Sequence, residues 1–225
     1  IVQRLIAAGA NLQAQDGNHN TPLHIAAQVN WEKHVALLIE SGANMEAVTL
    51  LDKSTPLIDA ARMSLESAQV LLEKGANVHA QSKHGETPLI AALAGGNPKA
   101  VPVLIDAGAD VNHVDAQGWP VLWHALRRTE DLKNPDHNSV NLLLAAHANP
   151  RMELPQGKTL MHVAAEHGRL DHLTTLIAMG VPALVEDVDG TTPLDLLNTH
   201  HPRLAEPFRQ RVLEQELPAP APRRP

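Results

Sequence analysis

A four-residue turn signature returns at a fixed interval along the first half of the chain. It reads GANL, GANM, GANV and GADV at residues 9–12, 42–45, 75–78 and 108–111, so that each copy begins 33 residues after the one before. Such self-similarity is the mark of repeat proteins, in which each repeat is a small unit that stacks on its neighbours. The signature therefore predicts a stacked array of repeats.

Each signature is followed 12 or 13 residues later by a helix start, which reads TPLH at 21–24, TPLI at 55–58 and 87–90, and a degraded PVLW at 120–123. The threonine side chain can accept a hydrogen bond from a free N–H of the first helical turn, and proline at the first helical position loses no hydrogen bond. A second helix with apolar spacing follows and ends at a glycine such as Gly42, which can take the left-handed conformation.

These residues resemble the ankyrin repeat, and the resemblance extends from residue 1 to about residue 200. It implies an all-α fold, an ankyrin-repeat solenoid of antiparallel helix pairs joined by hairpin-like loops. Six residues are inserted in the fourth full repeat, because the next signature, HANP, comes late. We expect a partial repeat at 1–13, full repeats at 14–46, 47–79, 80–112, 113–151 and 152–184, a C-terminal capping repeat at 185–217, and a flexible Pro-rich tail at 218–225.

The composition restricts the classes of function. Aromatic residues make up only 2% of the chain, so a core must consist of aliphatic side chains, and the net charge of -7 argues against a phosphate-binding, nucleic-acid surface. The absence of cysteine rules out disulfides and thiolate zinc sites. Because no apolar run approaches the roughly 18 residues of a membrane span, we expect a soluble protein, cytoplasmic or, if a signal before Ile1 was removed, periplasmic.

The 14 histidines invite a metal hypothesis. His162, His167 and His172 are evenly spaced, but a spacing of five does not gather side chains on one helix face, and Gly168 is expected to end a helix between the last two. The resemblance implies instead that His24 and His162 hydrogen-bond back to the threonine that caps their helix. We predict no metal, no cofactor, no catalytic residue and hence no enzyme.

Residues that the repeat does not require are free to recognise a partner. Trp119 occupies a hairpin position that is polar in the other repeats, and Arg127 and Arg128 belong to the same repeat. Tryptophan and arginine are enriched among binding hot spots, which favours an interface role for Trp119. The alternatives are that Trp119 packs within its own repeat and that Trp123 is partly buried. The candidate partner-binding residues are Trp119, Arg127, Arg128, Trp123, Arg62, Met63, Asp52, His84, Glu86, Lys158, Glu166 and His167. The resemblance implies that the hairpin tips and the exposed side of each first helix line a concave face. Its further members would be Asn18, Asn20, Gln28, Val29, Leu51, Ser54, Lys83, Leu93, Gln117 and Gln156.

The inserted segment 128–138 (RTEDLKNPDHN) allows two interpretations. Long loops on rigid scaffolds often carry function. An insertion at an exposed turn is also well tolerated, because the entropic cost of closing a loop grows slowly with its length. Both interpretations stay open.

The sequence thus predicts a protein-binding module that is monomeric on its own and docks another protein on its concave face. The net negative charge suggests a partner with a basic patch. A sharper hypothesis is an inhibitor, such as a bacterial immunity protein that blocks a toxic enzyme, since no second domain is evident. The alternative is a scaffold or adaptor that links two proteins.

Overall fold

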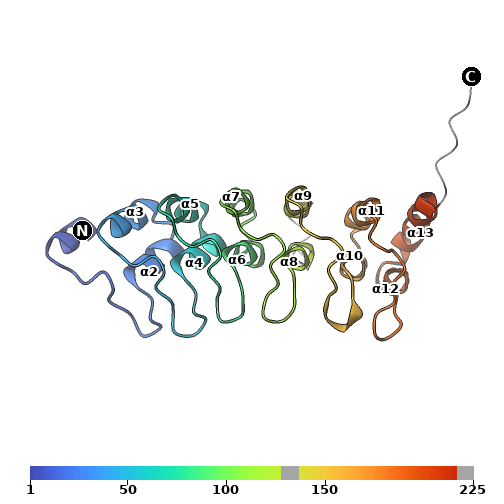
Figure 1. Ribbon diagram of the computed structural model, residues 1–225, viewed down its shortest axis with the longest axis horizontal. Helices are drawn as coiled ribbons and strands as arrows, with labels where there is room; N and C mark the ends of the chain where they lie inside the picture. Colours follow the sequence, from blue (N-terminus) through green and yellow to red (C-terminus); the bar gives the residue numbers. More distant parts are fainter. Residues whose placement is uncertain (128–136, 217–225) are drawn as a thin grey trace, which may run out of the picture. The chain divides into compact units, whose positions relative to one another are not determined.

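The computed structural model describes residues 1–127 and 137–216, and every regular element in these ranges is a helix (Figure 1). The prediction of an all-α fold is therefore confirmed. The helices are α1 (Val2–Ala7), α2 (Pro22–Gln28), α3 (Glu32–Glu40), α4 (Pro56–Met63), α5 (Leu65–Glu73), α6 (Pro88–Gly95), α7 (Ala100–Asp106), α8 (Val121–Arg127), α9 (His137–Ala145), α10 (Leu160–Glu166), α11 (Leu170–Ala178), α12 (Pro193–His200) and α13 (Pro202–Glu216), with a short 3-10 helix at Pro155–Gly157.

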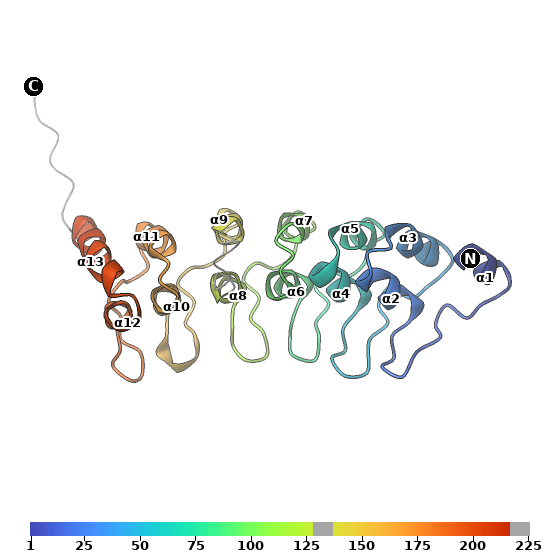
Figure 2. The ribbon, with the colours of Figure 1, turned by 180° about the vertical axis from the view of Figure 1, so that it is seen from behind.

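The described chain forms two compact units. Among the described residues, unit 1 contains 1–127 and 138–148, and unit 2 contains 137 and 149–216. Within unit 1, the first-row helices α2, α4, α6 and α8 lie between the second-row helices α3, α5, α7 and α9 and a set of projecting hairpins (Figures 1 and 2). In unit 2, α10 packs on α12, and α11 packs on α13. The repeat boundaries expected from the sequence stay a prediction, and the tail at 218–225 lies outside the described residues.

The TPLx motifs start the first-row helices as expected. The Thr21, Thr55 and Thr87 hydroxyls each accept a hydrogen bond from the backbone N–H three residues later, and each threonine is followed by the proline of the first helical turn. The His24 ring returns to Thr21, with Nδ1 2.9 Å from Oγ1, while its Nε2 lies 3.1 Å from the backbone oxygen of Ser54 in the next repeat. One histidine thus caps a helix and ties two repeats together.

The core of unit 1 is a strip of small and aliphatic side chains between the two rows. The leucine of each helix-start motif is at most 2% exposed, and the alanine pairs one turn later are buried as well. Small side chains allow the helices to approach closely, so α4 packs against both α2 and α6. The buried residues at these positions are Leu23, Ala26, Ala27, Leu57, Ala60, Ala61, Leu89, Ala91, Ala92 and Leu122.

Neighbouring hairpins of unit 1 are joined by backbone hydrogen bonds near their tips. The Lys83 N–H donates to the Asp52 carbonyl at 2.7 Å, and the Ala116 N–H donates to the His84 carbonyl at 2.9 Å. Gly85 permits the second contact, because its φ is +72° and a Cβ there would lie 2.6 Å from the Ala116 nitrogen. The hairpins therefore form a continuous, linked edge along unit 1.

We expect Gly85→Ala to lower the free energy of unfolding of unit 1 by about 1–3 kcal/mol more than Gly75→Ala does. Both glycines have positive φ, but a Cβ at Gly75 would meet nothing within 4 Å. The comparison, made by urea denaturation, therefore isolates the contact between hairpins. Equal destabilisation by the two substitutions would show that the two hairpins can move apart around the added Cβ with no loss of free energy of unfolding.

Candidate partner-binding face

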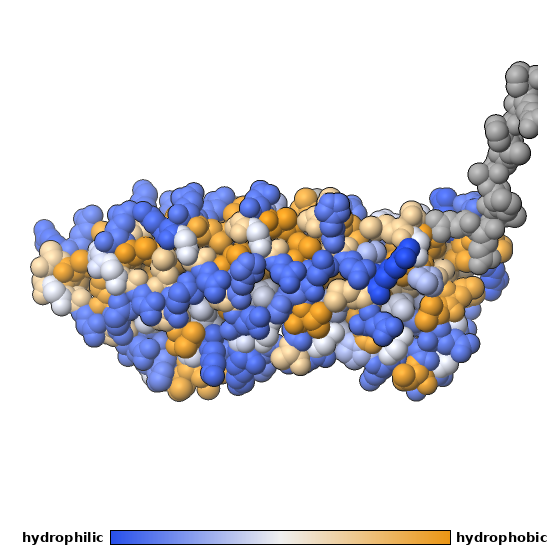
Figure 3. All heavy atoms as spheres, viewed as in Figure 1, coloured by the Kyte–Doolittle hydropathy of each residue, from blue (hydrophilic) through white to orange (hydrophobic). Residues whose placement is uncertain are grey.

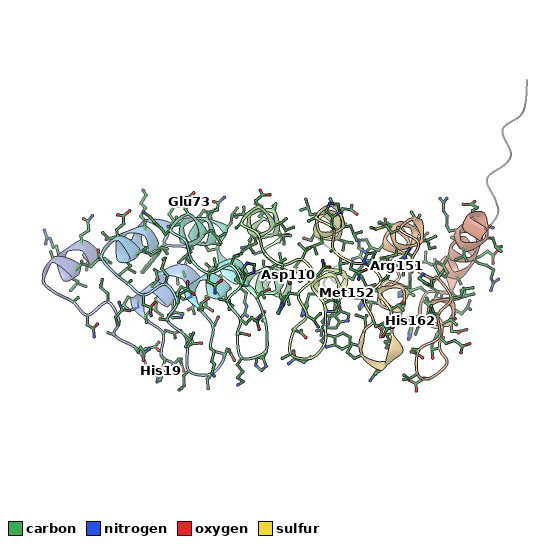
Figure 4. All side chains as sticks on the ribbon, in the orientation of Figure 1. His19, Glu73, Asp110, Arg151, Met152 and His162 are labelled. Atoms are coloured by element: carbon green, nitrogen blue, oxygen red, sulfur yellow. The ribbon has the colours of Figure 1, made fainter. Side chains whose placement is uncertain are left out.

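The hairpins and the outward side of the first-row helices form one surface of unit 1, which we call the hairpin face. Figure 3 shows polar and apolar side chains mixed along the lower part of unit 1, where the hairpins lie. His19 marks the tip of the first hairpin (Figure 4). The residues that define this face are Asn18, Asn20, Gln28, Val29, Leu51, Asp52, Arg62, Met63, Lys83, His84, Glu86, Gln117, Trp119, Trp123 and Arg127.

Trp119, Trp123 and Arg127 form an aromatic cluster on this face. The two indole rings stack with centroids 4.3 Å apart and an interplanar angle of 16°, and the Arg127 Cζ lies 5.0 Å from the centroid of the Trp123 ring. Both tryptophans are half-buried and Arg127 is exposed. Trp119 thus packs within its own repeat while part of its surface remains open. Its role at an interface stays a prediction.

Asp115 and His124 hold the aromatic cluster in place. One carboxylate oxygen of Asp115 accepts hydrogen bonds from the backbone N–H groups of Gln117 and Trp119, both at 2.9 Å, and the other lies 2.9 Å from the His124 Nε2. The His124 ring meets Trp123 edge-on at 4.9 Å. The hairpin that presents Trp119 is therefore anchored to the helix that presents Trp123.

The sequence analysis did not single out Asp115 or His124. A signal for Asp115 was present, because Asp16 and Asp187 stand at the same hairpin position and make the same two backbone hydrogen bonds. These bonds lower the pKa of Asp187, and in Asp16 the side-chain and backbone hydrogen bonds to Asn20 lower the carboxyl pKa in the same way. The contact between the Asp115 carboxylate and the His124 ring has no counterpart in those two hairpins. The repeated sequence pattern therefore could not predict it.

Burial lowers the pKa of His124 below its ordinary value, and the opposing effect of Asp115 is smaller. The unfolded chain therefore binds more protons at this residue than the folded chain, and unit 1 loses stability as the pH falls through the ordinary histidine range. We expect the melting temperature of His124→Gln to decline less than that of the wild type between about pH 7.5 and 5.5. His79→Gln, which removes an exposed imidazole, is the control. If the melting temperature of His124→Gln declined with pH as much as that of the wild type, His124 would not be the source of this pH dependence.

A second group of predicted residues meets on α4 and the two hairpins beside it. The Arg62 guanidinium forms an ion pair with Glu86, and the His84 Nε2 lies 3.9 Å from the Asp52 carboxylate. Burial raises the pKa of Glu86, against the opposing effect of Arg62. Met63 stands beside them with 63% of its surface exposed. These residues place both charge and an apolar side chain on the hairpin face.

The remaining candidates do not join these two groups. Lys158, Glu166 and His167 lie in unit 2, where Lys158 and His167 are half-buried and Glu166 is exposed. The prediction that Leu93 belongs to the face is wrong, because it is 2% exposed and part of the core. Arg128 and the inserted segment up to residue 136 lie outside the described residues.

His24 and His162 serve the fold. His162 repeats the arrangement of His24: its Nδ1 lies 2.9 Å from the Thr159 hydroxyl and its Nε2 lies 3.0 Å from the Thr191 carbonyl oxygen (Figure 4). No group of three His, Asp or Glu side chains that could hold a metal ion occurs in residues 1–127 or 137–216. None of the described helices has the length and apolar character that crossing a bilayer requires.

A profile of ankyrin repeats in three copies matches residues 1–82 and 69–134, more than half of the chain. The chain is also similar to the crystal structure of the ankyrin repeat domain of Bcl-3, described as a unique member of the IkappaB protein family, with a TM-score of 0.75 and 25% sequence identity. That match covers 93% of this chain and 90% of the other. The resemblance inferred from the turn and helix-start motifs is thereby confirmed.

The curated relatives match over shorter stretches. The chain is 37% identical over 70 residues to the protein fem-1 homolog A-A of Mus musculus, a match that covers 31% of this chain and 11% of that protein. It is 40% identical over 65 residues to the glycerophosphocholine phosphodiesterase gde1 of Schizosaccharomyces pombe, covering 29% of this chain and 6% of that protein. The shared segment is thus a small part of each of these relatives.

Proposed function

Because this chain belongs to the ankyrin-repeat family, a family of protein-interaction modules, we propose that it binds a partner protein through its hairpin face. The aromatic cluster is the observation that carries this proposal. Tryptophan and arginine dominate binding hot spots, since they remove a large area from water at a modest cost in side-chain entropy. Stacking and the anchor through Asp115 lower that cost further, because the cluster is already ordered in the free protein.

The proposed mechanism is surface complementarity without catalysis. A catalytic site needs converging titratable groups in a pocket with limited access to water. On the hairpin face two pairs of titratable groups are bonded to each other, Arg62 with Glu86 and His124 with Asp115. These pairs order the binding surface and give it charge.

In its finer form, the proposal is that the chain acts as an inhibitor that covers the active site of an enzyme, as an immunity protein covers a toxin. The support for this form is a composition rich in alanine and poor in aromatic residues. The curated relatives are eukaryotic, so a bacterial origin remains a prediction from composition. An adaptor that links two proteins is the competing function.

A pull-down from the native lysate with three forms of the chain as bait tests the proposal. The forms are the wild type, Trp119→Ala and Trp31→Ala. Trp31 is 53% exposed and lies outside the hairpin face, at the start of the second-row helix α3. We expect the same partner on the wild type and on Trp31→Ala, and its loss from Trp119→Ala. Retention of the partner by Trp119→Ala and its loss from Trp31→Ala would place the contact elsewhere and refute the proposal.

The recovered partner then separates the inhibitor from the adaptor. If it is an enzyme, we expect its activity to fall when wild-type chain is added and to remain when Trp119→Ala is added. An enzyme that keeps full activity while bound would exclude inhibition and favour the adaptor.

A further inference from the structure

A hollow of about 260 Å³ opens on the hairpin face between the first two full repeats. Its lining includes Asn18 and Gln28 of the first repeat, and Asp52, Asp59 and Arg62 of the second. We call it the Asp59 hollow. It is smaller than the roughly 300–1,000 Å³ of typical small-molecule sites. Its size therefore suits one side chain of a docked protein.

The Asp59 carboxylate lies in this hollow without a bonded cation. The residue is only 7% exposed, and its two oxygens accept hydrogen bonds from the Ser54 hydroxyl at 2.7 Å and from the Gln28 Nε2 at 2.9 Å. Both donors are neutral, and no ion pair to Asp59 occurs among the described residues. A buried carboxylate is costly unless it is paired with a positive charge. An incoming cation would therefore gain more here than at an exposed carboxylate.

The other charges around the hollow leave it acidic. Arg62 is the one cation in its lining, and its guanidinium is bound to Glu86. Lys83 stands near the rim, where its ammonium donates to the Leu51 carbonyl at 3.0 Å. With Arg62 offset by Glu86, and with Lys83 offsetting one of the two carboxylates of Asp52 and Asp59, one negative charge remains.

We infer that the Asp59 hollow receives an arginine side chain of the partner, an inference that rests on the proposed function. The planar guanidinium carries five donors, so it can bind the Asp59 and Asp52 carboxylates together with the Asn18 amide oxygen. Leu51, 64% exposed at the rim, can contact the aliphatic stem of the arginine. The net charge of -7 favours approach of such a basic partner.

The inference is tested on the full chain by titrating it with the peptide acetyl-Ala-Ala-Arg-Ala-Ala-amide. The matched control peptide contains citrulline, which has nearly the shape of arginine but no charge. Binding is followed by the NMR shifts of the Gln28 side-chain amide and of the Asn18, Ser54 and Asp59 backbone amides. We expect saturable shifts confined to these groups with the arginine peptide and none with the citrulline peptide.

Two substitutions complete the test. Asp52→Asn removes a charge from a side chain that is 61% exposed, so the fold is retained, and we expect the dissociation constant of the arginine peptide to rise at least fivefold. Glu73→Gln removes a charge from the second-row helix α5, on the side away from the hairpins, and should change the constant less than twofold (Figure 4). Equal shifts with both peptides, or equal effects of both substitutions, would overturn the inference.

The peptide titration and the pull-down test two separate claims, so either claim can be refuted while the other stands. If Trp119→Ala loses the partner but the arginine peptide produces no shifts, the hairpin face remains the docking surface and the arginine assignment falls. If the peptide binds but Trp119→Ala retains the partner, the hollow binds a cation but the proposed docking surface is refuted.

Discussion

Leu57→Ala is expected to lower the free energy of unfolding of unit 1 by about 2–5 kcal/mol. Leu57 is 1% exposed and lies in a cluster that includes Leu23 of the preceding repeat and Leu71 of its own second-row helix. Its truncation removes apolar contacts and leaves a cavity between two repeats, which tightly packed alanines cannot easily fill. Urea denaturation followed by circular dichroism measures the loss.

Leu51→Ala is the matched control for this prediction. The same atoms are removed six residues earlier in the chain, from a side chain that is 64% exposed on the hairpin face. We expect a change within about 0.5 kcal/mol. If the two substitutions were equally destabilising, the strip between the two helix rows would not be the core of unit 1.

Trp119→Ala is expected to weaken binding of the recovered partner by about 2 kcal/mol or more, roughly a 30-fold rise in the dissociation constant. The reason is that truncation removes the open ring and also the stacking that orders Trp123. Isothermal titration calorimetry measures the loss. Trp119→Phe keeps an aromatic ring at this position and should recover part of the affinity, whereas a change of less than threefold in Trp119→Ala would argue against a hot spot.

The stacked geometry also predicts that the two tryptophans act as one unit. We expect the affinity loss of the double variant Trp119→Ala, Trp123→Ala to be smaller than the sum of the two single losses, because residues in contact share their contribution. Additive losses would show that the partner contacts each ring separately. Thermal melts of all three variants check that the fold is retained.

The fold was largely predictable because its signals are local and recur. The threonine, proline and histidine of TPLH at residues 21–24 act within one helical turn, and the period of the signature relates each unit to the next. The family resemblance implied that His24 and His162 hydrogen-bond to the threonine that caps their helix, and the hydrogen bonds confirm this. A local pattern that recurs in register therefore specified helix starts, the core leucines and the all-α architecture.

The candidate site was less predictable, because it depends on side-chain geometry between elements. Position in the repeat placed Trp119 and Trp123 on one face, but it did not reveal that their rings stack. The pairing of Arg62 with Glu86 joins a helix to the hairpin of the next repeat, and Asp59 was not considered because the helix-start motif suggests no role for it. Leu93 was assigned to the face in error, because its burial depends on how neighbouring helices pack against α6.

Oxidative footprinting of the complex with the recovered partner tests the central claim most directly. Met63, 63% exposed, and half-buried Trp119 report on the hairpin face. Trp31 and Met179, 53% and 38% exposed, report on surfaces outside it. Mass spectrometry measures how fast each side chain is oxidised with and without the partner. We predict that the partner slows oxidation of Met63 and Trp119 and leaves Trp31 and Met179 unchanged, and the reverse pattern would contradict docking on the hairpin face.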